Sequence, residues 1–308
     1  MKRLTIPIAI LVVILIIWLV QSKIETRQIT GRIIENFLNL NADQITKIVT
    51  INGVDTLTFQ KDQGRWYLLD PLPRRTDSMA VLNMLSSAAG IRVGKVISEN
   101  VDRQGDFMVD KIGGNLVLFY RDDSLLSEVI IGKVASDRTH TYVRKPDSDE
   151  VYLADGLLTY TFRRQKSQWL DKTIFSFSPE SVAKIELVYP DDGIRLSVSD
   201  SAWYIAKKPY KDSILADSAI VVNFVRRVSN TFANDFVNAT DSGLIDFKNF
   251  SLKINISLDD GSTHSAEFAK ESKDNNRIYC RKPDLDETFV IYKSRFEGLK
   301  KKYSDFMP

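Results

Sequence analysis

The distribution of apolar residues along the chain changes near residue 22. Residues 4–20 form a run of 17 positions without a charge, dominated by Ile, Leu and Val. As a helix, a run of that length extends for about 25 Å, which is just enough to cross a thin bilayer core. The pattern predicts a transmembrane helix, with an anchor at 1–22 and a juxtamembrane segment at 23–42.

The juxtamembrane segment shows a helical spacing of apolar residues at Ile33, Ile34, Phe37 and Leu38. We expect a short helix over residues 24–40. It would either pack on the folded part of the chain or lie on the membrane surface.

Beyond residue 42, short stretches of alternating apolar and polar residues predict β-strands. Ile45–Ile51 and Thr56–Gln60 flank Asn52-Gly53, a dipeptide that favours a two-residue hairpin turn because it accepts positive φ. Further strands are expected at Arg65–Leu69, Leu116–Tyr120, Leu125–Ile131, Thr141–Arg144, Val151–Leu153, Ser251–Leu258 and Thr263–Ala269.

Two stretches have a helical period instead. Behind a possible N-cap at Asp77, apolar residues are spaced i, i+3, i+4 and i+7, and the same spacing recurs later in the chain. Each stretch predicts one amphipathic helix with one buried stripe. The stripes are Val81, Met84, Leu85 and Ala88, and then Val221, Phe224, Val225 and Val228. Shorter, cation-rich helical stretches are expected at Leu157–Lys166 and Ser294–Tyr303.

The chain also repeats itself. Tyr142–Leu153 reads Tyr-Val-Arg-Lys-Pro-Asp-Ser-Asp-Glu-Val-Tyr-Leu, and Tyr279–Val290 reads Tyr-Cys-Arg-Lys-Pro-Asp-Leu-Asp-Glu-Thr-Phe-Val, an offset of 279 − 142 = 137. Trp66-Tyr67 recurs as Trp203-Tyr204 at the same offset. Self-similarity at so long a period indicates a duplicated domain rather than a solenoid.

Together these patterns predict an α+β fold made of two tandem duplicated modules. Each module would be a mainly antiparallel sheet with one main helix, because its strands follow one another in hairpins. We place module 1 at 43–170, a linker at 171–179 and module 2 at 180–308, all after the N-terminal transmembrane helix.

Composition excludes several classes of function. The net charge is +2, from 42 basic and 40 acidic residues, which gives no electrostatic basis for binding nucleic acid. Cys280 is the only cysteine, so intrachain disulfides are excluded and a Cys-based zinc site is disfavoured. The two histidines, His140 and His264, have no motif partner for a catalytic triad. We predict no cofactor and no metal.

Two other interpretations of the N-terminal run compete with an uncleaved anchor. A cleaved signal peptide needs a small-residue cleavage site, and a lipoprotein needs a cysteine directly after the apolar run; neither follows Val20. Lys2 and Arg3 favour a cytoplasmic N-terminus. An uncleaved anchor would then place everything after residue 22 outside the cytoplasm.

The repeated turn supplies the candidate binding residues. Each copy brings two cations and three carboxylates to a hairpin turn, and such oxygens suit calcium, but the twelve-residue loop and distal glutamate of an EF-hand are missing. Either the turns are solvated hairpin tips with weak exposed ion pairs, or they contact a partner. The candidates are Arg144, Lys145, Asp147, Asp149 and Glu150, and then Arg281, Lys282, Asp284, Asp286 and Glu287.

Several motifs resemble a bacterial family known as domain of unknown function number 4340. They are the anchor, Lys47-Ile48, Gly64-Arg65-Trp66, Ile131-Gly132 followed by Tyr142-Val143-Arg144, Val151-Tyr152 and the basic stretch Arg163–Lys166. They cover most of 43–170, and the second module repeats them more loosely. Members are often associated with ABC-transporter and gliding-motility auxiliary proteins. The resemblance therefore implies an accessory role at the bacterial inner membrane, with the bulk of the chain periplasmic, and it brings no catalytic residues.

Three functions remain open at this point. The first is a non-enzymatic, membrane-anchored protein that acts as a tandem-repeat scaffold for a protein partner in the envelope, such as a component of an ABC-type transport system. The second is binding of a small molecule, glycan or lipid in a cleft between the modules. The third is a hydrolase whose site is built from carboxylates. We expect the first.

Overall fold

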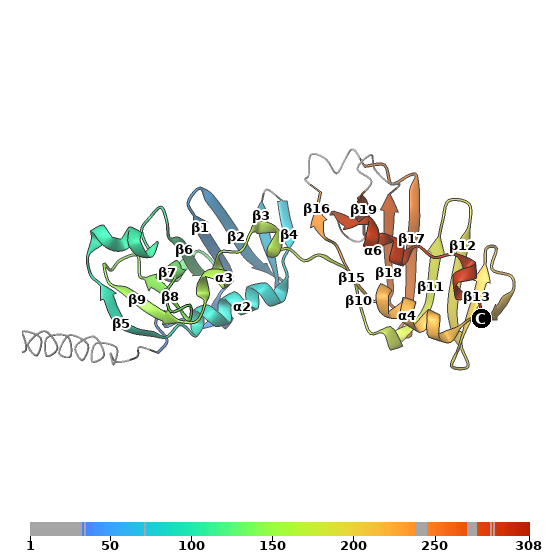
Figure 1. The fold of residues 1–308 in the computed structure, drawn as a ribbon, viewed down its shortest axis with the longest axis horizontal. Helices are drawn as coiled ribbons and strands as arrows, with labels where there is room; N and C mark the ends of the chain where they lie inside the picture. The colour runs from blue at the N-terminus through green and yellow to red at the C-terminus, as the bar shows by residue number, and fades with distance from the viewer. Residues whose placement is uncertain are drawn as a thin grey trace, which may run out of the picture. The chain divides into compact units, whose positions relative to one another are not determined.

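The computed structural model describes residues 33, 35–70, 72–237, 245–269, 276–283, 285 and 287–308 (Figure 1). The predicted anchor at 1–22 lies outside these residues. Among the described helices, none has the length and apolar character needed to span a membrane. The chain divides into two compact units, unit 1, which ends at Asp171, and unit 2, Lys172–Pro308.

Unit 1 is built on a nine-stranded antiparallel sheet with the order β4-β3-β2-β1-β6-β7-β8-β9-β5. Its strands are β1 (Lys47–Asn52), β2 (Asp55–Asp62), β3 (Arg65–Asp70), β4 (Leu72–Arg75), β5 (Val93–Ser98), β6 (Asn115–Arg121), β7 (Ser124–Val134), β8 (His140–Arg144) and β9 (Val151–Asp155). Its helices are α2 (Ser78–Ala89), α3 (Leu158–Phe162) and the 3₁₀ helices η1 (Ala42–Gln44), η2 (Val101–Phe107) and η3 (Lys166–Gln168).

Unit 2 has a second nine-stranded antiparallel sheet, in the order β14-β13-β12-β11-β17-β18-β19-β20-β16, and a two-stranded sheet of β10 and β15. Its strands are β10 (Thr173–Ser176), β11 (Val182–Val188), β12 (Gly193–Ser199), β13 (Ala202–Lys207), β14 (Ser213–Leu215), β15 (Asn230–Phe232), β16 (Asp235–Phe236), β17 (Phe250–Leu258), β18 (Thr263–Ala269), β19 (Arg277–Arg281) and β20 (Thr288–Tyr292). Its helices are α4 (Ser218–Val228), α6 (Lys293–Leu299), η4 (Pro179–Ser181) and η5 (Tyr303–Phe306).

The protein is therefore strand-rich α+β with two large antiparallel sheets, and this part of the predicted fold is confirmed. Counted along each unit, the two large sheets have the same strand order. In both, four strands precede the main helix, and the strand that closes the far edge (β5 or β16) comes directly before the second group of four strands.

Each main helix covers one face of its sheet with the predicted apolar stripe. Val81, Met84, Leu85 and Ala88 are buried in α2, and Val221, Phe224, Val225 and Val228 are buried in α4. Both helices begin at an aspartate N-cap. The Asp77 carboxylate accepts hydrogen bonds from Met79 N and Ala80 N, and the Asp217 carboxylate accepts them from Ala219 N and Ile220 N. Trp66 and Trp203 are buried in β3 and β13.

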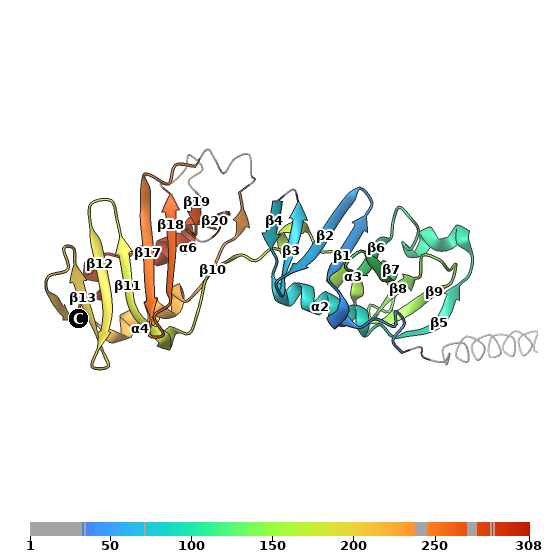
Figure 2. The same cartoon turned by 180° about the vertical axis from the view of Figure 1, so that it is seen from behind.

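Alternation along the strands gives each large sheet an inner face toward the core and an outer face. In unit 2, Ile185, Leu196 and Ile254 belong to the buried cluster, together with Val225 of α4. Along the same strands, the residues that alternate with these buried ones are only partly buried, and they lie on the outer face of the sheet. Figure 2, the view from behind, shows strands β11, β12 and β17 without a helix drawn across them.

Two segments differ from the sequence predictions. The segment 171–179, predicted as a linker, contains β10, which pairs with β15, and Pro179, the first residue of η4. The predicted helix over 24–40 is wrong for its described residues, 33 and 35–40, which form bends, turns and irregular structure. Asn36 and Asn39 have positive φ values of 54° and 48°, a conformation in which an α-helix cannot continue.

Candidate functional site

Arg144, the first candidate, closes the β8 strand and is only 6% exposed. Its Nε donates to Val109 O at 3.1 Å, and its Nη1 donates to Lys145 O at 3.1 Å and to Ser148 O at 2.8 Å. Burial lowers the pKa of this guanidinium from its ordinary value, while the nearby charges of Asp149 and Asp110 act in the opposite direction. Arg144 therefore stabilises the turn through buried hydrogen bonds to main-chain carbonyls, and its guanidinium does not project into solvent.

The other candidate residues of the first repeated turn lie around the Arg144 guanidinium. Lys145 Nζ sits 5.1 Å from the centre of the Phe37 ring, and Asp147 is exposed. Asp149 Oδ1 accepts a long hydrogen bond, 3.5 Å, from Gln104 Nε2. Glu150 Oε2 accepts from the Tyr152 hydroxyl at 2.6 Å. Burial, followed by the contact with Glu150, raises the pKa of Tyr152 to about 12.

The second repeated turn has the same residue types, but the residues around them differ. Arg281 is exposed, and its Nε and Nη2 donate to Glu267 Oε2 at 2.7 and 2.6 Å. Its guanidinium also lies 4.6 Å from the centre of the Phe247 ring. Lys282 and Glu287 are half-buried. Asp284 and Asp286 lie outside the described residues. The two repeated turns belong to different units.

Arg281 belongs to a charged row on the outer face of the unit 2 sheet. The strand register places Lys253, Glu267 and Arg281 side by side on β17, β18 and β19. Lys253 Nζ lies 3.1 Å from Glu267 Oε1, and the Glu267 side chain is 14% exposed. Burial opposes ionisation of Glu267, but hydrogen bonds from Arg281 and Lys253 outweigh it and hold the pKa of this carboxyl below its ordinary value.

A second ion-pair group lies on neighbouring strands of the same face. Glu186 on β11 is directly opposite Arg195 on β12, with Arg195 Nε 2.8 Å from Glu186 Oε1. Lys184 Nζ approaches the same carboxylate at 3.8 Å. The outer face of unit 2 is therefore a broad polar surface in which each glutamate lies between two cations.

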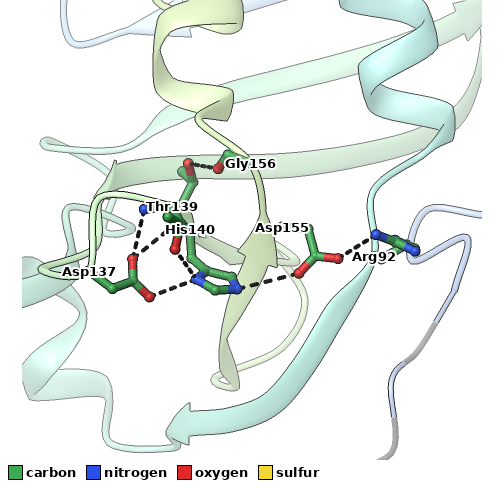
Figure 3. A network of polar contacts seen from close by, with 7 residues as sticks. Arg92, Asp137, Thr139, His140, Asp155 and Gly156 are labelled. Atoms are coloured by element: carbon green, nitrogen blue, oxygen red, sulfur yellow. Dashed lines mark hydrogen bonds and ion pairs between the residues drawn. The ribbon is translucent and has the colours of Figure 1, made fainter.

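A cluster that the sequence did not indicate lies around His140 in unit 1 (Figure 3). The His140 ring stands between two carboxylates: Nδ1 is 2.6 Å from Asp137 Oδ2, and Nε2 is 3.4 Å from Asp155 Oδ1. Arg92 Nη2 lies 2.8 Å from Asp155 Oδ2. The cluster joins the β7–β8 turn, the end of β9 and the residue just before β5.

Both ring nitrogens of His140 face acceptors. A neutral imidazole has one N–H and can donate to only one of the two carboxylates, whereas an imidazolium can donate to both. The side chains are about half exposed: His140 is 36% and Asp155 47% accessible. This geometry suits an ion-pair clasp between three segments, since neither nitrogen is directed at a vacant position where a substrate could react.

The remaining titratable candidates are engaged or buried. The Cys280 thiol is fully buried and burial raises its pKa, so thiolate chemistry is suppressed. His264 stacks on Phe177 with ring centres 5.2 Å apart. Within the ranges that the structure describes, no group of three or more His, Cys, Asp or Glu side chains is arranged to hold a metal ion.

Comparison with family models gives a match. A family model described as Domain of unknown function (DUF4340) matches residues 66–249, from β3 in unit 1 to the residue before β17 in unit 2. The match confirms the resemblance to this family and crosses the division between the units. It includes the motifs from Trp66 to Lys166 and begins after Lys47-Ile48. No curated protein and no solved structure matches the chain significantly.

Proposed function

We propose that this chain, which belongs to the DUF4340 family because the match covers more than half of its 308 residues, is a non-enzymatic binding protein held at a membrane. Two duplicated modules would act as a scaffold outside the cytoplasm and bind a protein partner in the envelope, such as a component of an ABC-type transport system. The family description carries no activity, so the proposal rests on the chain itself.

Details of the two units support the duplication. The main-chain N–H of Asp77 donates to Trp169 O at 2.8 Å, and that of Asp217 donates to Phe306 O at 2.9 Å. Trp169 and Phe306 are 137 positions apart and both are fully buried. Thr76 N donates to Trp66 O as Ala216 N donates to Trp203 O. Together with the common strand order, these paired contacts favour descent of both units from one ancestor.

The observation that carries the binding role is the outer face of unit 2. Charged side chains in folded proteins mostly face solvent. In unit 2 they form rows on the flat outer face of a sheet, where a partner can dock over several strands at once. Ion pairs of this kind contribute little to stability, about 0–1 kcal/mol each when exposed. Across an interface they contribute mainly to specificity and to the association rate.

The place on a membrane is a separate part of the proposal. It rests on the uncharged run at 4–20 and on the cations Lys2 and Arg3 before it. Cell fractionation followed by protease accessibility tests it. We expect the intact chain in the inner-membrane fraction, with the part after residue 22 digested only from the periplasmic side. Loss of residues 1–22 from the mature chain would contradict the anchor.

Photo-crosslinking in living cells tests the binding role. Tyr204 lies on the outer face of β13, opposite Ser197, and an aromatic photo-crosslinker such as p-benzoylphenylalanine replaces it conservatively. We expect Tyr204→p-benzoylphenylalanine to give one discrete adduct with an envelope protein, and Lys184→Glu on the same face to reduce that adduct several-fold. The control places the same probe at Tyr160 of unit 1, which is 70% exposed.

Two results would contradict the binding role. One is an adduct pattern from Tyr204 that does not differ from that of the Tyr160 control. The other is the absence of any adduct at Tyr204 together with turnover of a metabolite by the purified protein.

A further inference from the structure

The edge strands of the two large sheets occupy matching places but differ in what lies beside them. β4 closes one edge of the unit 1 sheet, and β14 closes the matching edge of the unit 2 sheet. Tyr67 is opposite Arg75 as Tyr204 is opposite Leu215, so the two edge strands correspond at an offset of 215 − 75 = 140. An edge strand presents unpaired main-chain N–H and C=O groups to any chain that lies beside it.

Two features close the edge of unit 1. Main-chain groups along an edge strand point alternately toward the sheet and away from it, and Thr76 N donates to β3. Arg75 and Pro73 therefore direct their main-chain groups outward. Asp171 N donates to Arg75 O at 3.0 Å, and Leu170 forms an antiparallel bridge with Thr76, so an extended segment of the chain itself lies beside the end of β4. At the other outward position, Pro73 has no N–H to offer a further strand.

The edge of unit 2 lacks both features. Ala216 N donates to β13, so Ser213 and Leu215 direct their N–H and C=O groups outward. Ser213 stands at the place of the β4 proline, at an offset of 140, and retains its N–H. Pro308 is the counterpart, at an offset of 137, of the aspartate that pairs in unit 1, and it has no N–H to donate to Leu215 O. Among the residues that the structure describes, no strand pairs with the outward side of β14, and all three of its residues are exposed.

The side chains of β14 suit an added strand that carries an apolar residue. Ile214 is opposite Ile205, which is fully buried, so Ile214 lies on the core side of the sheet and is nevertheless 42% exposed. An apolar residue placed opposite Ile214 would cover it and extend the buried row by one strand, and apolar cross-strand pairs of this kind stabilise a sheet. Leu215 is opposite Tyr204 on the outer face and is 55% exposed.

We propose that β14 receives an extended segment of the partner protein, which pairs with the main chain of Ser213 and Leu215 and places an apolar residue opposite Ile214. Such strand addition to an open edge is a general mode of peptide recognition. The inference rests on the proposed function, because the partner that docks on the outer face supplies the strand. Leu215 and Tyr204 share that face, so the edge is continuous with the proposed docking surface. A second copy of the chain, paired edge to edge, would contribute only its own three-residue strand, which is far smaller than a stable interface.

Photo-crosslinking from the edge in living cells tests the proposal. We expect Leu215→p-benzoylphenylalanine to give an adduct with the same envelope protein that Tyr204→p-benzoylphenylalanine captures. Adding Ser213→Pro gives β14 the residue that β4 carries at the matching position, and it removes an outward N–H without removing a hydrogen bond of the sheet. The variant should fold, as judged by circular dichroism, and reduce the Leu215 adduct at least tenfold. Ser213→Ala is the matched control, because it removes the hydroxyl and keeps the N–H, and the adduct should remain.

Hydrogen exchange of the purified full-length chain in detergent gives a second readout that needs no partner. We expect the amides of Ser213 and Leu215 to exchange as unpaired groups do, and those of Ile214 and Ala216 to be protected by their bonds to β13. Protection of the Ser213 and Leu215 amides in the isolated chain would overturn the proposal.

Three crosslinking results would also overturn it. One is a Leu215 adduct that is equally strong in the Ser213→Pro and Ser213→Ala variants. Another is a Leu215 adduct with twice the mass of the chain, which is the result expected if two copies pair edge to edge. The third is a Tyr204 adduct without any adduct at Leu215, which would leave the docking face of the proposed function in place. Absence of both adducts would overturn the added strand and the proposed function together.

Discussion

At the scale of single residues, the same side chain has two different roles because its cross-strand neighbour differs. Arg144 and Arg281 occupy matching places in the repeated turn. Opposite Arg144 on β7 is Ile130, whereas opposite Arg281 on β18 is Glu267. With an apolar neighbour, the guanidinium of Arg144 turns to main-chain carbonyls and is buried. With a carboxylate neighbour, that of Arg281 forms an exposed ion pair.

This difference predicts unequal effects of one substitution. Arg144→Ala removes the donor to Val109 O, Lys145 O and Ser148 O, and buried acceptors left unpaired make it costly. We expect a loss of about 3 kcal/mol in the free energy of unfolding. Arg281→Ala is the matched control and should cost less than about 1 kcal/mol. Urea denaturation of the two variants measures both. Equal losses of the free energy of unfolding would contradict the conclusion that the buried hydrogen bonds of Arg144 stabilise the turn.

The acidic residue of the clasp predicts a dependence on pH. The Thr139 main-chain N–H, and then His140, stabilise the ionised Asp137 and lower its pKa to about 2. An unfolded aspartate has a pKa of about 3.9, so the folded state binds its proton less readily. The stabilisation is therefore complete above about pH 4 and is lost as the pH falls toward 2.

The measurement compares the stability of the wild type and of Asp137→Asn as a function of pH. The difference should shrink as the pH falls from about 4 toward 2. A difference that does not change between pH 4 and pH 2 would show that the carboxylate charge has no part in the clasp.

Part of this residue-scale picture could be predicted and part could not. A hairpin with Arg144 opposite Val151 necessarily puts His140 opposite Asp155. The strand pairing expected on either side of the turn therefore already implied the contact between His140 and Asp155. Arg92 comes from a distant segment, and only the tertiary fold shows that β5 lies beside β9. Burial of Arg144 depends on Val109, which is 35 positions earlier and gives no periodic signal.

At the scale of elements, local sequence specified the two main helices. An aspartate, a serine and then an apolar stripe recur at Asp77 and Asp217, and both carboxylates cap their helices through the same two main-chain donors. Elements with a strong local signal of this kind form as predicted, because cap and stripe favour the same boundaries.

The two caps predict closely similar losses. Asp77→Ala and Asp217→Ala each leave two N–H groups of a first helical turn without their acceptor, and each should lower the free energy of unfolding by about 1 kcal/mol. Asp→Asn at the same positions is the control, because asparagine caps about as well. Urea denaturation gives the values. If one Asp→Ala substitution left the free energy of unfolding unchanged while the other lowered it by several kcal/mol, the two helices would not be equivalent elements.

Elements with a weak local signal were missed or misplaced. β4 contains Pro73 and β5 contains Gly94, and β5 pairs with β9 through two irregularities, so neither shows clean alternation. The first hairpin loop is Gly53-Val54 rather than Asn52-Gly53, because Asn52 still pairs with Asp55 and Gly53 supplies the positive φ of 61°.

The expected juxtamembrane helix failed for a different reason. Its apolar residues Phe37 and Leu38 are buried as an amphipathic segment should be. The asparagines beside them adopt positive φ, which asparagine tolerates better than most residues, and the segment packs as turns. The apolar spacing therefore predicted burial correctly at Phe37 and Leu38 but not at Ile33, which is 61% exposed, and it predicted the wrong conformation.

At the scale of the whole molecule, the two compact units share a strand order and differ in the outer faces of their sheets. On that face, unit 1 has Val49 opposite Leu118, whereas unit 2 has glutamates between cations. The proposed binding role rests on these surfaces. Among the described residues, His264 is stacked, His140 is paired and Cys280 is buried.

The measurement that tests this description most directly is the folding of unit 2 alone, expressed as residues 172–308. If the unit is complete, it gives the circular dichroism of an antiparallel β-protein and one cooperative urea transition, since its own core of Trp203, Phe224 and Phe268 is intact. Residues 35–171 should behave in the same way. A fragment that stays unfolded, or that folds only when the other is added, would contradict the claim of two self-contained units.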